Sequence, residues 1–404
     1  MTFLFGVFVC ATLAQMAVWH FLFGRLARYR PPVPGGNAVL PPVSVIICAR
    51  NEAANLQKYL PAVLEQRYPD FEVLVVDDDS GDETPAVLAA FQAKYARLRV
   101  LRLSPKTSPG KKYALAQGIA ATRHEHLVFT DADCEPAGRE WLLRMTDGGL
   151  RIADYGLWID PTLGTANQSG QRNHTKRSAN PQSAIRNPQS EITLGYAPYR
   201  PGPGLLNRWT RFETVYTAMQ YFSFALAGWP YMGVGRNLAW QKALFQRVGG
   251  FDAHARIPSG DDDLLVNAAA HAGNTALCLA PEAFVYSNAK KNWADWYRQK
   301  RRHLGAGKLY RPQHRIALAL LTLTLVLHYF LLSVLLFSDF GTISVAFYAV
   351  RMALAAGIYW RILRQFRDEQ LIIWFPLLDA VLAIYFAVMV PLVLIRSNYL
   401  ISWK

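Results

Sequence analysis

Four stretches of this chain are apolar over about the 20 residues that a helix needs to cross the hydrocarbon core of a bilayer. They are Thr2–Phe23, Ile316–Ser338, Thr342–Trp360 and Leu371–Ile395. The chain has 404 residues, 52% of them hydrophobic, and one long soluble segment separates the first stretch from the other three. The sequence therefore predicts a multi-pass membrane protein with four transmembrane helices and a soluble domain after the first.

The positions of the basic residues predict how these helices are oriented. If the stretches cross in alternate directions, three basic clusters fall on one side: Arg25, Arg28 and Arg30; Lys290–Arg315; and Arg361, Arg364 and Arg367. Because cytoplasmic loops are enriched in Lys and Arg, this side, which includes the soluble domain, is predicted to be the cytoplasm. Arg396 and Lys404 fall on the other side. We expect a protein of the plasma (inner) membrane.

The N-terminal stretch and the net charge each have a competing interpretation. Residues 1–24 are interpreted as a retained transmembrane anchor rather than a signal peptide, because no basic leader precedes the stretch and no small-residue cleavage site follows it. The net charge of +14 does not indicate nucleic-acid binding, which requires the charge to cluster on a soluble module. We expect a partner in the lipid bilayer and none in nucleic acid.

The soluble domain, residues 43–304, begins with short β-branched runs that alternate with helix-length segments. The predicted strands are Val43–Cys48, Phe71–Asp77, Leu98–Leu103 and His126–Thr130, and the predicted helices are Ala53–Gln66, Thr84–Tyr95 and Lys111–Thr122. This alternation predicts an α/β fold with a sheet that is covered on both faces. Residues 25–42 are predicted to be a linker rich in Pro and Gly, 153–192 a low-complexity insertion, and 305–404 the membrane domain.

Acidic side chains follow the predicted strands at the edge of the sheet where such folds bind ligands. Asp77, Asp78 and Asp79 follow the second strand, and Asp131 and Asp133 follow the fourth. Five carboxylates in one crevice need cations nearby, and a metal ion with a phosphorylated ligand meets this need. Asp131 and Asp133 are the predicted ligands of Mg²⁺ or Mn²⁺, both of which prefer oxygen donors.

Three further features lie outside the predicted strands. Lys111 opens a helix and is expected beside phosphate groups. In PSGDDDLLVN, from Pro258 to Asn267, one of three adjacent aspartates is expected either to act as a general base or to cap a helix, and Asp261 fits both roles. An aromatic stripe on the helical segment Leu205–Leu226 is expected either in the core or at the membrane interface.

Taken together, these motifs resemble the membrane-bound family 2 glycosyltransferases, which include cellulose, chitin and hyaluronan synthases. The matching pieces run from Val43 to about Leu304: SVIICARNEAANL, EVLVVDDDSGDET, GKKYAL, TDADCEP, GGFD, GDDDLL and QKRRH. The resemblance implies a GT-A fold with a Rossmann-like mixed sheet. It also implies a nucleoside-diphosphate sugar as donor, a divalent cation, and inversion at the anomeric carbon.

The resemblance also assigns roles to individual residues. Glu52 and Asp77 would hold the base and the ribose with Asp78 beside them, and Lys111 would lie by the nucleotide. Asp131 and Asp133 would hold the metal and the diphosphate. The E-D-x-D-L motif of the family aligns on GDDDL, which places the catalytic aspartate at Asp261, with Asp262 as the alternative because Gly260 stands in place of the glutamate.

The acceptor side departs from the processive members of the family. Their Q-x-x-R-W motif appears here as Gln299, Arg302 and His303, and a histidine offers a sugar less stacking surface than the tryptophan does. Arg236, in GVGRNLAW, is expected to contact a phosphate. We expect an inverting transferase that moves a sugar from a UDP-sugar to a lipid-linked or polysaccharide acceptor at the cytoplasmic face. The alternatives are a processive synthase that exports its polymer, an inactive membrane scaffold and a nucleotidyltransferase.

Two charged residues lie inside the predicted transmembrane helices. Arg351 and Asp379 are at similar depths from the cytoplasmic ends of the third and fourth stretches. An unpaired charge at this depth costs a few kcal/mol, about 3 on insertion scales. We therefore expect Arg351 and Asp379 to form an ion pair between adjacent helices.

Overall fold

The computed structural model describes residues 1–31, 40–104, 110–146, 190–255, 257 and 259–395. Most of the predicted insertion at 153–192 lies outside these residues. Its predicted end is wrong, because Ile192 is fully buried and begins a strand, β6 (Ile192–Gly195).

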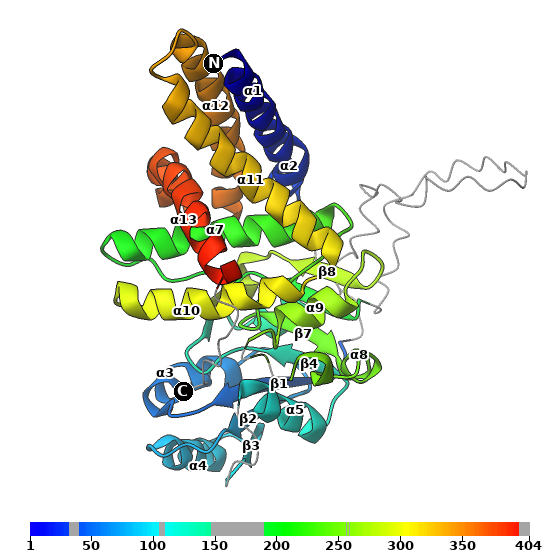
Figure 1. Cartoon of the computed structure of the whole chain (residues 1–404). Helices are drawn as coiled ribbons and strands as arrows, with labels where there is room; N and C mark the ends of the chain where they lie inside the picture. The colour runs from blue at the N-terminus through cyan, green and yellow to red at the C-terminus, as the bar shows by residue number, and fades with distance from the viewer. Residues whose placement is uncertain (32–39, 105–109, 147–189, 256, 258, 396–404) are drawn as a thin grey trace, which may run out of the picture.

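A mixed seven-stranded sheet forms the centre of the soluble domain (Figure 1). Its strands are β1 (Val43–Ala49), β2 (Phe71–Asp77), β3 (Leu98–Arg102), β4 (His126–Phe129), β6, β7 (Leu238–Gln241) and β8 (Thr275–Cys278), in the order β3-β2-β1-β4-β7-β6-β8. The four predicted strands are confirmed, and they pair in parallel. β7 runs antiparallel to both β4 and β6. β5 (Glu135–Pro136) and β9 (Val285–Tyr286) form a separate pair.

Both faces of this sheet are buried, as the predicted alternation of strands and helices requires. In β1, Val45 and Ile47 point into the core beneath α3 (Ala53–Leu64) and α4 (Thr84–Lys94). Ile46 and Cys48 point the other way, into the core that includes α5 (Lys111–Ala121). The remaining short elements are α6 (Trp141–Thr146), α8 (Lys242–Arg247), η4 (Asp252–His254), α9 (Asp263–Ala269), η5 (Pro281–Ala283) and η6 (Gly307–Leu309).

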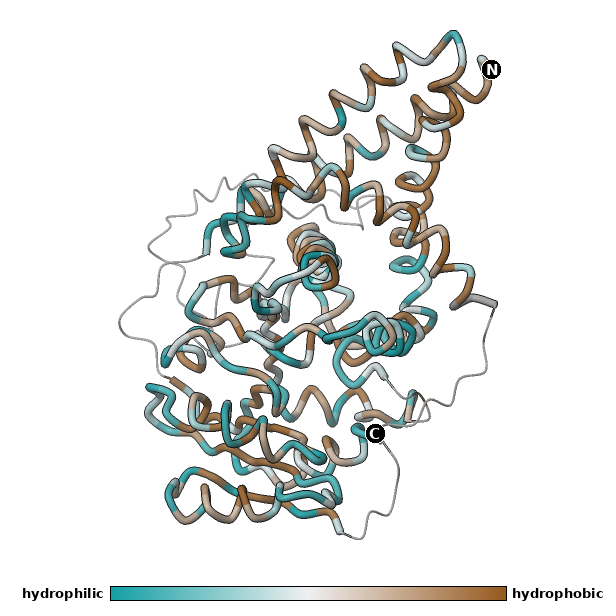
Figure 2. The backbone as a smooth tube through the Cα atoms, turned by 90° about the vertical axis from the view of Figure 1, so that its left-hand side faces the viewer, coloured by the Kyte–Doolittle hydropathy of each residue, from teal (hydrophilic) through white to brown (hydrophobic). Residues whose placement is uncertain are grey.

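Within the described residues, four helices are long and apolar enough to cross a membrane: Thr2–Arg28, Pro312–Leu335, Gly341–Phe366 and Glu369–Leu392. They comprise α1 (Thr2–Ala17), η1 (Val18–Phe23) and α2 (Gly24–Arg28); α11 (Pro312–Leu335); α12 (Gly341–Phe366); and η7 (Glu369–Trp374) with α13 (Phe375–Ile395). The first helix continues through Arg28, so the linker does not begin at residue 25 as predicted. α1, α11 and α12 lie side by side above the sheet domain (Figure 1), and Figure 2 shows their largely apolar composition.

Helix α7 (Leu205–Leu226) lies between the sheet and this bundle (Figure 1). Its predicted aromatic stripe is buried, which confirms the core interpretation. Phe212 packs against Phe375 of α13 at a ring separation of 6.5 Å, and Arg211 forms a buried ion pair with Asp368. α10 (Trp293–Ala306) is tied to α7 by an ion pair between Lys300 and Glu213. The sheet domain and the bundle of apolar helices therefore share one hydrophobic core.

The predicted ion pair between Arg351 and Asp379 is confirmed. Both side chains are completely buried, at 0% and 1% exposure. The Tyr329 hydroxyl donates to the same Asp379 oxygen at 2.7 Å, and the Arg351 guanidinium also donates to Gln15 on α1 at 3.3 Å. This polar cluster joins α1, α11, α12 and α13 inside the bundle.

Candidate active site

The loops that follow β1 and β2 interlock at the carboxyl edge of the sheet. The register pairs Ala49 with Asp77, so the two strands end side by side. The Asn51 backbone N–H donates to Ser80 Oγ at 3.0 Å, and the Gly81 N–H donates to Asn51 Oδ1 at 2.9 Å. Asn51 and Asp79 both have left-handed backbones, with φ of 56° and 58°. Such conformations are costly and concentrate at functional sites.

Glu52 and Asp77, expected to bind the nucleoside, belong to these two loops. Asp77 is 1% exposed and accepts a hydrogen bond from the Ser80 N–H at 3.1 Å, while Asp78 beside it is buried. Burial raises the pKa of the Glu52 carboxyl, Asn55 opposes this with a hydrogen bond, and the charges of Asp133 and Asp131 raise the pKa further. The negative charges of Asp131 and Asp133 therefore favour the protonated form of Glu52.

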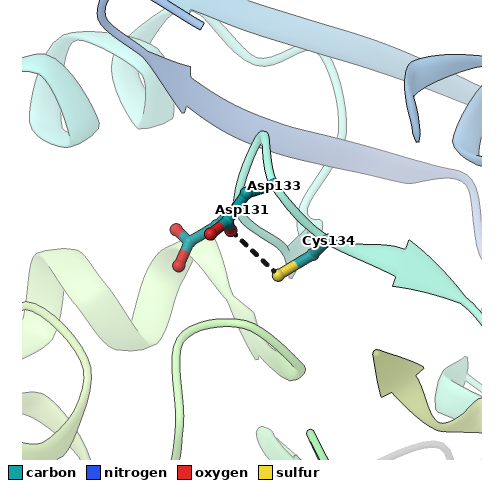
Figure 3. A group of neighbouring side chains, drawn as sticks. All are labelled: Asp131, Asp133 and Cys134. Carbon is teal, nitrogen blue, oxygen red and sulfur yellow. Dashed lines mark hydrogen bonds between the residues drawn. The ribbon is translucent and has the colours of Figure 1, made fainter. Parts of the chain in front are cut away.

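Asp131 and Asp133 lie on the turn that follows β4, together with Cys134 (Figure 3). Their potential ligand atoms all lie within 4.8 Å of one another. Asp133 accepts hydrogen bonds from Cys134 Sγ and from Ser287 Oγ, each at 3.4 Å. Burial raises the pKa of the Cys134 thiol well above its ordinary value. The oxygen donors of this set are two partly exposed carboxylates, and oxygen is the donor that Mg²⁺ and Mn²⁺ prefer over sulfur.

The ammonium of Lys111 connects this acid pair to the second acid cluster. Its Nζ lies 2.7 Å from Asp131 Oδ1 and 3.3 Å from Asp261 Oδ2. Burial lowers the pKa of Lys111, but the two carboxylates outweigh that effect and raise it well above its ordinary value. Lys111 is therefore a permanent cation between a predicted metal ligand and a predicted base.

The three adjacent aspartates of the second cluster have different surroundings. Asp262 is the N-cap of α9 and accepts from the Asp263 N–H at 2.8 Å and from the Gly235 N–H at 2.7 Å. Asp263 accepts from the Leu264 N–H at 2.8 Å and from the Tyr310 hydroxyl at 2.6 Å. Asp261 instead faces Lys111.

The electrostatics of the cluster follow these contacts. Burial and the charge of Asp261 raise the pKa of Asp262 to about 6. Burial and the charge of Asp262 raise the pKa of Asp263 to about 7. Burial also acts on Asp261, but the charge of Lys111 holds the pKa of that carboxyl below its ordinary value. Asp261 is therefore the member of the cluster with the lowest pKa, and it is ionised at neutral pH.

The departure of this sequence from the family motif at Gly260 has a structural reason. Gly260 has a φ of +89°, and a Cβ there would lie 2.3 Å from Leu264 Cδ1. A glutamate at this position would have a strained backbone, and its Cβ would meet the Leu264 side chain.

The residues expected on the acceptor side gather around an aromatic residue that the sequence analysis missed, Tyr199. The Arg236 guanidinium lies over its ring at 4.4 Å, and Gln299 Nε2 donates to its hydroxyl at 3.3 Å. Arg236 also donates to the Ala197 carbonyl at 2.9 Å, and its other terminal nitrogen has no hydrogen-bond partner within the described part of the chain. YAPYR carries no motif by itself, so no local signal marked Tyr199.

Arg302 and His303 lie on α10. The Arg302 carbonyl accepts from Ser259 Oγ at 3.0 Å, which ties α10 to the segment before Asp261. His303 keeps access to solvent. Desolvation by the surrounding protein and the nearby charges of Lys300, Arg302, Arg236 and Lys111 hold its pKa well below its ordinary value. The predicted site residues thus lie on the loops at the carboxyl edge of the sheet, on the segments next to them, and on α10.

Comparisons with known proteins identify the family of this sequence and its fold. The family described as "Glycosyl transferase family 2" matches residues 44–148, and "Glycosyl transferase family group 2" matches residues 193–390. A beta-monoglucosyldiacylglycerol synthase of Nostoc sp. is 36% identical over 118 residues, which are 29% of this chain and 25% of that protein. The probable glycosyltransferase YdaM of Bacillus subtilis is 24% identical over 273 residues, 65% of this chain and 54% of that protein.

The matches to these relatives thus span between a quarter and about half of the relatives' own length, 25% and 54%. A solved structure supports the fold over nearly the whole chain. The mannosyltransferase PcManGT from Pyrobaculum calidifontis, in complex with GDP-Man and Mn²⁺, has a TM-score of 0.53 at 16% identity, covering 95% of this chain and 99% of that one. The chain therefore carries domains that match glycosyl transferase family 2, in a fold of the GT-A type that is joined to apolar helices long enough to span a membrane.

Proposed function

We propose that the protein is an inverting glycosyltransferase that moves a sugar from a nucleoside-diphosphate sugar, a UDP-sugar, to a lipid-linked or polysaccharide acceptor. The observation that carries this proposal is the position of Lys111 between Asp131 and Asp261, at 2.7 and 3.3 Å. One cation therefore separates the acid pair suited to a metal ion from the one aspartate of the second cluster that faces the site.

In the proposed reaction each group has one task. Glu52, Asp77 and Asp78 hold the nucleoside, and Lys111 and Arg236 face the phosphates. Asp131 and Asp133 hold the divalent cation, which when bound neutralises charge on the leaving diphosphate. The acceptor hydroxyl attacks the anomeric carbon of the sugar from the side opposite the diphosphate. Its proton passes to Asp261, the bond from carbon to the diphosphate oxygen breaks, and the configuration inverts.

The class of acceptor is inferred from the relatives and from α10. Among the relatives, one is named for a glucosyldiacylglycerol product and another is a poly-beta-1,6-N-acetyl-D-glucosamine synthase of Staphylococcus epidermidis. Gln299, Arg302 and His303 lie on α10, which runs next to α7 and below the bundle (Figure 1). This position suits an acceptor that is anchored in the membrane. The histidine in place of tryptophan favours a single transfer over processive synthesis.

A cytoplasmic site at the plasma membrane is part of the proposal. Exposed arginines, Arg28, Arg361 and Arg364, lie at the ends of α2 and α12 that face the sheet domain. Gln365 Nε2 donates to the Ala27 and Tyr29 carbonyls, each at 3.3 Å, and thus joins these two helix ends. If the helix ends that carry these arginines face the cytoplasm, protease should cleave the sheet domain in inverted vesicles but not in intact cells.

The test is turnover with purified protein in lipid nanodiscs. UDP-glucose, UDP-N-acetylglucosamine and GDP-mannose are supplied with Mn²⁺ or Mg²⁺, and release of the nucleotide and product mass are measured. Asp261→Asn should lower turnover by roughly 10²-fold or more and keep donor affinity. Asp262→Asn should mainly lower stability, by about 1–3 kcal/mol, because the amide can still cap α9 but replaces one of the two oxygens that accept from Asp263 and Gly235. Near-normal turnover in Asp261→Asn would overturn the assignment of the base.

A further inference from the structure

Helix α9, which begins with the second acid cluster, is fixed by hydrogen bonds to residues at the start of α11. The Tyr310 hydroxyl donates to Asp263 Oδ2 at 2.6 Å, and the Arg311 backbone N–H donates to Asn267 Oδ1 at 2.8 Å. Asn267 Nδ2 lies 3.0 Å from Nδ1 of His314, the third residue of α11. The lower end of α11 lies directly above α9 (Figure 1). Three successive contacts thus connect α9 to the first turn of α11.

These contacts are buried, so they constrain the position of α9. Tyr310 and Asp263 are each 8% exposed, and Asn267 and His314 are each 3% exposed. A buried carboxylate that loses its donor carries the full desolvation penalty, whereas an exposed one is compensated by water. The first oxygen of Asp263 is engaged by the Leu264 N–H, so the second depends on Tyr310.

The neighbouring residues pass this constraint on to Asp261. Both oxygens of Asp262 are engaged, by the N–H groups of Asp263 and Gly235, so the turn has little freedom on that side. At the other end of the turn, Gly260 has a φ of +89° and passes so close to the Leu264 side chain that a Cβ would not fit. Asp261 lies between Gly260 and the engaged Asp262, 3.3 Å from Lys111.

We propose that Tyr310 is a positioning residue for the reaction, which places Asp261 through its hydrogen bond to Asp263. The position of α11 in the membrane is thereby coupled to the position of the Asp261 carboxylate. This inference rests on the proposed function, in which Asp261 accepts the proton. Tyr310 itself touches neither the donor nor the acceptor in this scheme.

The experiment compares Tyr310→Phe with Tyr385→Phe in the full-length protein in nanodiscs. Tyr385 is a matched control, because it is also a buried tyrosine but its hydroxyl has no hydrogen-bond partner within the described residues. Tyr310→Phe should lower kcat by about tenfold or more and leave the donor KM within about twofold, since a small displacement of a reacting group has large kinetic effects. Tyr385→Phe should leave both constants unchanged.

A double-mutant cycle tests the route of the effect. Because Tyr310 acts through Asp263, the losses of kcat in Tyr310→Phe and Asp263→Ala should not add in the double variant. Additive losses would overturn the proposal, as would a Tyr310→Phe variant that behaves like Tyr385→Phe. A variant that lowers the melting temperature and changes kcat and KM together would also overturn it, because that pattern marks a purely structural residue.

Failure of this inference is distinguishable from failure of the proposed function. If Asp261→Asn keeps its turnover, the base is assigned wrongly, whatever Tyr310→Phe shows. If Asp261→Asn loses turnover while Tyr310→Phe keeps it, only the positioning role is wrong.

Discussion

The ammonium nitrogen of Lys111 lies 3.3 Å from a carboxylate oxygen of Asp261, although the two residues are far apart in the sequence. This contact determines the ionisation of the proposed base. Burial alone raises the pKa of Asp261, and the charge of Lys111 reverses that effect. Lys111 therefore keeps Asp261 able to accept a proton near neutral pH.

We predict that Lys111→Met moves the acid limb of the pH–rate profile to higher pH. Turnover is lost as pH falls through the pKa of the base, and without Lys111 the pKa of Asp261 rises. The profile should be measured at saturating donor, because Lys111 is also expected to contact the nucleotide. Lys58→Met, on the exposed side of α3, is the control and should leave the limb in place. An unshifted limb in Lys111→Met would show that Asp261 does not limit the rate at low pH.

The acid pair after β4 gives a prediction about metal dependence. Asp133→Ala should abolish Mn²⁺-dependent binding of UDP while the protein stays folded, because a single carboxylate then remains at the site. EDTA should have the same effect on the wild type, and added Mn²⁺ should restore binding. Isothermal titration of UDP measures both effects.

Cys134→Ser is the matched variant for that experiment. Its sulfur lies within 4.8 Å of the carboxylate ligand atoms, but burial keeps the pKa of the thiol high, so binding should be unaffected. Loss of binding in Cys134→Ser, or full binding in Asp133→Ala, would contradict the assignment of the two carboxylates as ligands.

The parts of the fold that the sequence predicted are those determined by local pattern. The runs that form β1, β2 and β4 are β-branched and separated by helix-length segments, so their parallel pairing followed from the alternation. Acidic residues directly after such strands had to meet at one edge of the sheet. The ion pair between Arg351 and Asp379 was predictable for a similar reason, because depth in a helix follows from residue number.

The parts that were missed depend on contacts between distant segments. β6, β7 and β8 have four residues each, and β7 runs antiparallel within an otherwise parallel arrangement, so neither their pattern nor their order was visible. Tyr199 and Tyr310 have no motif around them, and their importance comes from Arg236 and Asp263, which lie on other elements.

Gly260 gives a prediction that separates backbone strain from a steric clash of the added Cβ. Gly260→Ala should be more destabilising than Gly249→Ala. Both glycines have positive φ, and an alanine there costs about 1–2 kcal/mol, but a Cβ at Gly249 meets nothing within 4 Å whereas one at Gly260 lies 2.3 Å from Leu264. Thermal unfolding measures the difference. Equal destabilisation of the two variants would show that the turn before Asp261 is free to relax.

The buried ion pair in the bundle gives the last prediction. Arg351→Met and Asp379→Leu should each lower the free energy of unfolding by roughly 3–5 kcal/mol, because each leaves one charge buried without its counterpart. The double variant should recover most of this loss, since replacing a whole buried pair by apolar side chains is often neutral. Thermal unfolding in nanodiscs measures all three variants, and turnover reports whether the sheet domain responds. Tyr329 and Gln15 remain in the double variant without their charged partners, so full recovery is not expected. Losses that simply add in the double variant would show that Arg351 and Asp379 contribute independently to the stability of the bundle.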